Sequence, residues 1–211
     1  MRPKEIILIR HGESEGNVNA KIYEYTPDHE LKLTQNGKKQ VIEVGKELKN
    51  IIGNQRIQFY TSPMLRAHET TEILINEINP PGYELTEEPR IREQDWGNFQ
   101  NVEETKQFKQ ERKIYGSFYY RFANGESGAD VFDRVSSFFE TLHRHFQDPD
   151  FPPILIIITH GVTLRCFLMR WYHWSVKKFE KLKNPDNCDY VIMELNNEGK
   201  YTLKKGLQEV D

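Results

Sequence analysis

Residues 6–17 read IILIRHGESEGN, and this stretch decides the fold. Its first four residues, Ile6 to Ile9, form a continuous aliphatic run, which is typical of a strand buried on both faces. The run ends at Arg10-His11-Gly12, so charged and titratable side chains follow directly on a buried strand. Such a strand belongs inside a sheet covered by helices on both sides, and its end is where function is sought first.

Strands alternate with helices along the rest of the chain. Further strands are predicted at 55–61, 83–87, 154–158, 190–195 and 201–205. Apolar residues at helical spacing predict helices at 34–52, 63–78, 129–146 and 162–174. This alternation predicts an α/β fold, a three-layer α/β/α sandwich with a mostly parallel central sheet. A length of 211 residues suits one domain spanning the whole chain.

Three of these strands end in residues that carry chemistry. The carboxyl ends of parallel strands lie at one edge of the sheet, and ligands bind outside that edge. The edge would hold Arg10, His11, Ser62, Arg66, His160 and Gly161. A lone histidine is more often a hydrogen-bonded core residue, but here each histidine precedes a glycine, which permits close backbone approach. Backbone N–H groups at the helix start after His160 would favour a bound anion.

A phosphoryl group fits this set of side chains. Its charge is spread over three equatorial oxygens, which the forks of Arg10 and Arg66 would neutralise. A neutral imidazole such as His11 can attack phosphorus and be released later by water. Its other ring nitrogen should then donate to a backbone carbonyl.

A proton must also reach the leaving oxygen. Glu93, in the stretch IREQDWG at 91–97, is the candidate general acid. Apolar neighbours such as Trp96 would raise its pKa and keep it protonated. Glu13 and Asp95 remain alternatives, and a solvated loop carboxylate is the plainer interpretation of Glu93.

Five segments in this order resemble the signature of the histidine phosphatase superfamily, in its phosphoglycerate mutase-like branch. The first is Arg10-His11-Gly12 with Asn17, similar to R-H-G-x-x-x-x-N. The others are Leu33-Thr34-x-x-Gly37-x-x-Gln40, Ser62-Pro63-x-x-Arg66-Ala67-x-x-Thr70, Gly125-Glu126-Ser127 with Arg134, and Thr159-His160-Gly161. Each pattern alone is weak, but the five together are specific and cover nearly the whole chain.

The resemblance implies a role for each matched residue. It implies that His11 is transiently phosphorylated, and that Glu93 protonates the leaving group and then activates water. The phosphoryl oxygens would be held by Arg10, Arg66 and His160, with Asn17 at the phosphate pocket. No metal or organic cofactor is expected, and no Cys or His cluster in the sequence has ligand spacing.

Departures from the mutases favour a phosphatase. Where cofactor-dependent mutases carry E-R-H-Y-G, this chain has Glu93-Gln94-Asp95-Trp96-Gly97, so a neutral amide replaces the arginine that binds the second charged group of their substrate. The F-T-G-W segment of the mutases has no counterpart in residues 20–31. The stretch from Gln94 to Phe99 is similar to that of eukaryotic broad-range acid phosphatases. Mutase activity remains the alternative.

Residues 101–124 are predicted to form a cap insertion that decides the substrate. Their basic residues Arg112, Lys113 and Arg121 would bind a second phosphate, and the aromatic residues would bind an organic moiety. An equally weighted alternative is a helix whose aromatic side chains pack on the core while its charges face water.

Net charge and composition argue against nucleic acid and membranes as partners. A net charge of −3 gives no basic field for nucleic acid or an anionic membrane. The longest aliphatic run is too short to span a bilayer and no signal-peptide segment is recognised, so a cytoplasmic protein, with a nuclear pool as an option, is expected. The expected partner is a phosphorylated small molecule or phosphoprotein substrate. A catalytically silent binder of a phosphorylated partner is a further alternative, although all the residues above are present. The oligomeric state is left open.

Overall fold

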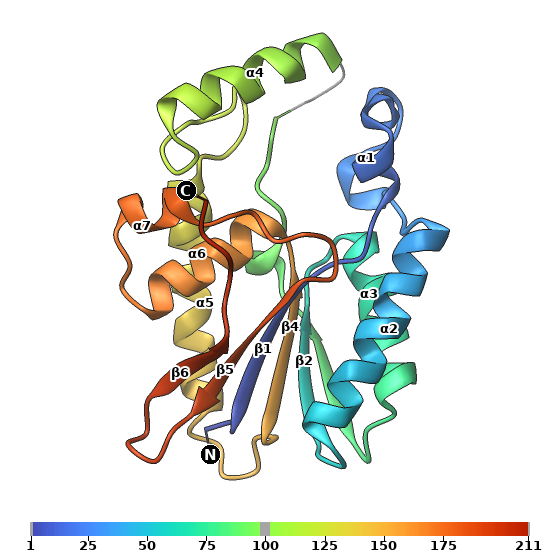
Figure 1. The fold of residues 1–211 in the computed structure, drawn as a ribbon, viewed down its shortest axis with the longest axis vertical. Coiled ribbons are helices and arrows are strands. Elements are labelled where there is room, and N and C mark those ends of the chain that lie inside the picture. Colours follow the sequence, from blue (N-terminus) through green and yellow to red (C-terminus); the bar gives the residue numbers. More distant parts are fainter. Residues whose placement is uncertain (1, 98–101, 211) are drawn as a thin grey trace.

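Parallel strands form the centre of the molecule. The computed structural model describes residues 2–97 and 102–210, and in this part of the chain six strands form one sheet in the order β3-β2-β4-β1-β5-β6. The strands are β1 Glu5–Arg10, β2 Ile57–Thr61, β3 Tyr83–Glu87, β4 Ile154–Thr159, β5 Tyr190–Leu195 and β6 Tyr201–Lys205. Strands β1 to β4 pair in parallel, whereas β5 pairs antiparallel with β1 and with β6 (Figure 1).

Helices cover both faces of this sheet. Helices α2 and α3 lie on one face and α5 and α6 on the other (Figure 1). The α-helices are α1 Glu15–Val18, α2 Gln35–Ile52, α3 Leu65–Ile78, α4 Val102–Tyr115, α5 Gly128–His145, α6 Gly161–Trp171 and α7 Val176–Lys181. Short 3₁₀ helices are η1 Ala20–Glu24, η2 Asp28–Glu30 and η3 Pro89–Ile91. The predicted three-layer α/β/α arrangement with a mostly parallel sheet is confirmed.

The aliphatic run at 6–9 is buried on both faces because its side chains enter two different cores. Ile6 and Leu8 pack with residues of α5 and α6, whereas Ile7 and Ile9 pack with residues of α2 and α3. All four are fully buried. Two-sided burial removes the polar alternation that a half-exposed strand would show.

The pairing of β1 with β4 brings the two histidines together. Arg10 is the register partner of Thr159, so His11 and His160 are the next residues on adjacent parallel strands. The backbone N–H of His11 donates to the carbonyl of Thr159 at 3.0 Å, and the two imidazole centroids lie 5.0 Å apart. Strand β2 flanks β4 on its other side, and the N–H of Ser62 donates to the carbonyl of Ile158 at 3.0 Å.

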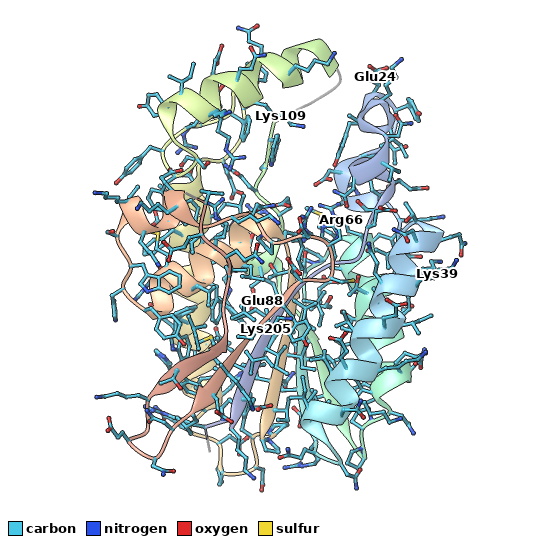
Figure 2. All side chains as sticks on the ribbon, viewed as in Figure 1. Glu24, Lys39, Arg66, Glu88, Lys109 and Lys205 are labelled. Carbon is cyan, nitrogen blue, oxygen red and sulfur yellow. The ribbon has the colours of Figure 1, made fainter. Side chains whose placement is uncertain are left out.

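Two segments rise above this carboxyl edge. One contains α1, η1 and η2, and the other is α4 with the loop that follows it (Figure 1). Figure 2 shows Glu24 near the tip of the first, Lys109 beneath the second and Arg66 between them at the base. Residues 98, 99 and 101, which belong to the acid phosphatase-like stretch and to the predicted cap, lie outside the described residues. None of the described helices combines the length and apolar character that crossing a bilayer requires.

Candidate active site

A cavity of about 1030 Å³ lies between these two segments, with the strand-end residues at its base. Its base includes Arg10, His11, Arg66 and Glu93. One wall comes from residues 14–28 and the other from Trp96, α4 and α6. A cavity of this size suits a small organic ligand.

His11 lines this cavity, and the hydrogen bonds of its ring fix its tautomer. Its Nδ1 lies 2.7 Å from the carbonyl oxygen of Gly12, which can only accept, so Nδ1 carries the proton. The other nitrogen, Nε2, accepts from Nε of Arg66 at 3.3 Å. Burial, followed by the charges of Arg66 and Arg10, lowers the pKa of His11 well below 6.5. The ring is therefore neutral near pH 7, with Nε2 as its nucleophilic atom.

His160 is fully buried beside His11, and one of its nitrogens has no partner. Its Nε2 lies 2.7 Å from the hydroxyl oxygen of Ser62, whereas Nδ1 has no hydrogen bond and lies 3.8 Å from the carboxylate of Glu93. Burial, followed by the charges of Arg66 and His11, lowers the pKa of His160 well below 6.5. A ligand oxygen at this place would satisfy Nδ1, because a buried polar atom without a partner is costly.

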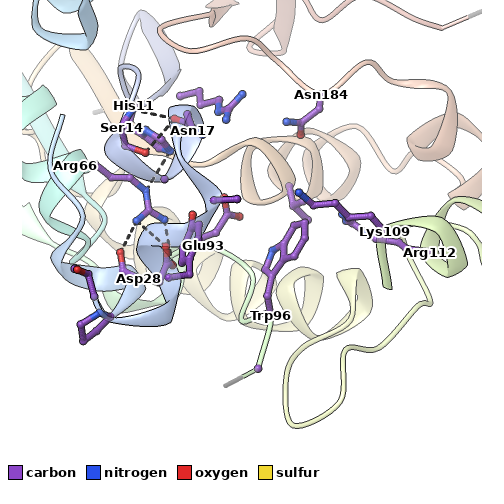
Figure 3. A pocket seen from close by; sticks show the side chains of 18 of the residues that line it. His11, Ser14, Asn17, Asp28, Arg66, Glu93, Trp96, Lys109, Arg112 and Asn184 are labelled. Carbon is purple, nitrogen blue, oxygen red and sulfur yellow. Dashed lines mark hydrogen bonds and ion pairs between the residues drawn. The ribbon is translucent and has the colours of Figure 1, made fainter. Parts of the chain in front are cut away.

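Arg66 is paired with a carboxylate of the chain itself. Its Nη1 donates to Oδ1 of Asp28 at 3.0 Å and its Nη2 to Oδ2 at 3.3 Å, while Nη1 also donates to the backbone carbonyl of Asp28 at 2.7 Å (Figure 3). The side chain of Arg66 is 4% exposed and that of Asp28 is 38% exposed. Asp28 thus occupies the guanidinium fork that an anionic ligand would use.

The surroundings of Glu93 favour its protonated form. Burial raises the pKa of its carboxyl above 4.5, against the opposing effects of Arg66 and of the backbone N–H of Gln94. That N–H donates to Oε1 at 2.9 Å. The two other candidates for the general acid, Glu13 and Asp95, have different surroundings. The carboxylate of Glu13 accepts hydrogen bonds from the side chains of Thr34 and Asn36. Asp95 is exposed, and its carboxylate accepts from the N–H of Gly97.

The loop that carries Glu93 is fixed by a partly buried ion-pair network. Arg134 donates to the backbone carbonyls of Arg90 at 2.6 Å and Glu93 at 3.1 Å. Its Nε also pairs with Glu126 at 3.0 Å, and Arg92 pairs with the same carboxylate at 2.6 Å. The Gly125-Glu126-Ser127 segment therefore sets the position of Glu93 without lining the cavity.

Asn17 and Gly161 contribute to the site in different ways. Oδ1 of Asn17 accepts from the N–H of Ser14 at 2.9 Å and from Nδ2 of Asn187 at 3.0 Å, so its amide nitrogen is the atom available to a ligand oxygen. Gly161 does not line the cavity, but a Cβ there would lie 2.4 Å from the side chain of Asn184, which does. Gly161 thus allows Asn184 to lie over the start of α6.

The basic residues of the cap are separated by the structure. Arg112 lines the cavity, with its guanidinium 5.3 Å from the ring centroid of Trp96. Lys113 and Arg121, which were expected to bind substrate, do not line the cavity. Lys113 is exposed on α4, because successive helical residues point about 100° apart. Arg121 instead pairs with Asp130 at 2.7 Å.

None of the described aromatic residues of the cap lines the cavity. Phe118 and Phe122 are buried, at 5% and 0% exposure, and pack in the interior, whereas Tyr115 and Tyr119 are 70% and 60% exposed. The aromatic residues Tyr23, Tyr25 and Trp96, which lie outside the cap, line the cavity. Among the described residues no group of three or more His, Cys, Asp or Glu side chains could hold a metal ion.

Sequence reasoning missed several cavity residues, among them Asp28, Tyr23, Asn184 and Arg165. Asp28 and Tyr23 lie in a segment without periodicity, and Asn184 follows α7, so none carried a signal. Arg165 did carry one, because it is the single charged residue in the apolar stretch from Val162 to Met169. It lies on the cavity wall one helical turn beyond Gly161.

The model of the histidine phosphatase superfamily (branch 1) matches residues 6–207. The phosphoglycerate mutase-like protein AT74H of Arabidopsis thaliana is 44% identical, over 96% of this chain and 78% of its own. The broad-range acid phosphatase DET1 of Saccharomyces cerevisiae is 31% identical, over 96% and 89%. A solved mycobacterial glucosyl-3-phosphoglycerate phosphatase has a similar fold, with a TM-score of 0.73, 17% identity, and coverage of 95% and 97%.

Proposed function

Because this chain belongs to the histidine phosphatase superfamily (branch 1), we propose that it hydrolyses phosphomonoesters through a phosphohistidine on His11. One observation carries the proposal. The carbonyl of Gly12 holds the proton on Nδ1, so the neutral ring offers Nε2 to a cavity that also holds Arg10, Arg66 and Glu93. Such a site pairs a nucleophile with an acid and with cations for phosphoryl oxygens.

In the first step Nε2 of His11 attacks phosphorus in line with the ester oxygen. The bond to that oxygen breaks while protonated Glu93 gives it a proton, and the alcohol leaves. Arg10, Arg66 and His160 hold the equatorial oxygens, which requires the substrate to displace Asp28 from the fork of Arg66. In the second step the Glu93 carboxylate takes a proton from water, which attacks the phosphohistidine and releases inorganic phosphate.

Hydrolysis is favoured over mutase chemistry by the yeast relative, which is named a broad-range acid phosphatase and matches over nearly the whole chain. The missing counterpart of the F-T-G-W segment supports the same choice. A silent binder is less consistent with the site, because the nucleophile, the acid and both arginines border one cavity.

Trapping of the intermediate tests the proposal. Brief incubation with ³²P-labelled nitrophenyl phosphate, stopped without acid, should label His11, and the phosphorus should be bound to Nε2, which nuclear magnetic resonance identifies. The His11→Ala variant should lose the label, while His143→Gln, which changes an exposed histidine on α5, should keep it. Label that survives His11→Ala would move the nucleophile elsewhere, and a wild-type protein that binds phosphate without hydrolysing esters would be the silent binder.

A further inference from the structure

Two arginines of the wall formed by α4 and α6 line the cavity without a carboxylate partner. Arg165, on α6, is 5% exposed, and Arg112 comes from α4. Nη2 of Arg165 donates to the carbonyl of Phe179 at 2.7 Å, and Nη2 of Arg112 donates to Oε1 of Gln94 at 3.1 Å. The Nε atom of each is buried and has no hydrogen-bond partner.

This arrangement is costly unless an anion completes it. Burial lowers the pKa of Arg112, and it lowers the pKa of Arg165 to about 10. The charge of Glu180 acts against this lowering for both arginines, and that of Glu93 does so for Arg112, but among the described residues neither guanidinium forms an ion pair with a carboxylate. A buried cation with an unpaired donor gains most from a charged, hydrogen-bonding ligand.

Gln94, at the position where the mutases carry an arginine, contacts Arg112. Mutases of this family carry an arginine at this position, and the glutamine alone suggested a neutral end of the cavity. In the structure the Gln94 amide is anchored by its own bond to the carbonyl of Glu126 at 2.8 Å, and its oxygen holds the guanidinium of Arg112. The positive charge missing at position 94 is thus supplied from α4.

We infer that Arg112 and Arg165 form a second anion subsite, so that the preferred substrates are phosphomonoesters whose organic part carries a carboxylate or a second phosphate. The inference rests on the proposed function, because the first anion is the phosphate attacked by His11. Trp96, Lys109 and Arg112 lie together across the cavity from Arg66 and Asp28 (Figure 3). A molecule spanning the cavity would therefore place its two charges at opposite ends, with its carbon chain near Trp96.

Three substrates with one carbon skeleton test this inference. They are the phosphate esters of 3-hydroxypropionate and 1,3-propanediol, and 1,3-propanediol bisphosphate, which end in a carboxylate, a hydroxyl and a phosphate. Wild-type kcat/KM should be higher for the two substrates with a charged end than for the substrate that ends in a hydroxyl. Comparison of the two charged substrates shows whether the subsite prefers a carboxylate or a phosphate. In Arg112→Gln the ratio of charged to neutral substrate should fall by about ten- to a hundredfold, the size expected for a lost hydrogen bond to a charged group.

Lys113→Gln is the matched control, because it removes the same charge from the next residue, outside the cavity, and should keep the ratio. Arg165→Gln should lower the ratio as Arg112→Gln does, and if this buried change prevents folding, Arg112→Gln decides. Equal use of all three substrates, or a ratio unchanged by Arg112→Gln, would overturn the subsite and leave the phosphatase proposal standing. Hydrolysis of none of them, with no label on His11, would overturn both.

Discussion

His11 and Glu93 are moved from their ordinary pKa values in opposite directions by the same cause, burial. The imidazole stays neutral to a pH well below 6.5, and the carboxyl stays protonated to a pH above 4.5. The proposed reaction needs neutral His11 together with protonated Glu93. We therefore expect kcat/KM to fall as pH rises through the raised pKa of Glu93 and, at lower pH, as His11 becomes protonated.

The change Glu93→Gln tests the proton donor. Alkyl phosphates need a proton on the leaving oxygen, so their rate of His11 phosphorylation should fall by about a hundred- to ten-thousandfold. Nitrophenyl phosphate has a good leaving group and should lose far less in this step. Single-turnover kinetics measure the step separately from water activation.

Asp95→Asn is the control for this change, since Asp95 is on the same loop, is exposed and does not line the cavity. It should react like the wild type with both kinds of ester. Equal losses for the two leaving groups in Glu93→Gln would remove Glu93 from the role of acid.

Residues at strand ends could be placed from the sequence, because the carboxyl ends of parallel strands must share an edge. The meeting of His11 with His160 depends only on β1 pairing with β4 in register. Lys113 could not be excluded in this way, because the rotation of α4 about its axis is set by packing. Asp28 was beyond reach for another reason, since its contact with Arg66 joins residues 38 apart across an irregular segment.

Regular elements with strong local signals were predictable at the scale of helices and strands. For α2, the Thr34 side chain accepts from the N–H of Gly37, and Gly53 has φ of 64°, a value that side chains disfavour. The hairpin of β5 and β6 follows from its turn residues. The 3₁₀ helices η1 and η2 could not be predicted, because three to five residues are too few to show a period.

Two fully buried, neutral histidines should make the stability of the whole molecule depend on pH. His11 and His160 have a lower pKa in the folded protein than in the unfolded chain. Below about pH 6.5 the unfolded chain therefore binds more protons than the folded protein, and the free energy of unfolding falls as pH falls. The slope is at most about 1.4 kcal/mol per pH unit for each histidine. Glu93 acts in the opposite sense, since its stabilising share is present at low pH and is lost as pH rises through its raised pKa.

Urea unfolding of the wild type between pH 7 and pH 5 should show this loss. The slope should decrease in His160→Gln, whose amide can still bond to Ser62, and should persist in His143→Gln. A slope that is the same in His160→Gln as in the wild type would mean that the ring of His160 protonates as freely in the folded protein as in the unfolded chain.

The ion pair between Asp28 and Arg66 makes a prediction about inhibition. Inorganic phosphate must displace the Asp28 carboxylate, so Asp28→Asn should lower its competitive inhibition constant by about two- to fivefold, a modest change because Asp28 is partly exposed. Glu24→Gln, which changes a cavity-lining carboxylate that does not contact Arg66, should leave the constant unchanged. Weaker inhibition in Asp28→Asn would show that Asp28 orients Arg66 for phosphate instead of competing with it.

A carboxylate tethered beside the fork is a competitor that dilution cannot remove. The effective concentration of the Asp28 carboxylate is set by the chain and not by the solution. Every anionic ligand therefore competes with the same carboxylate for the guanidinium of Arg66. On the proposed mechanism, a dianionic phosphate would compete for the fork more strongly than a monoanionic carboxylate or sulfate ester. The returning carboxylate would then favour release of inorganic phosphate after each turnover.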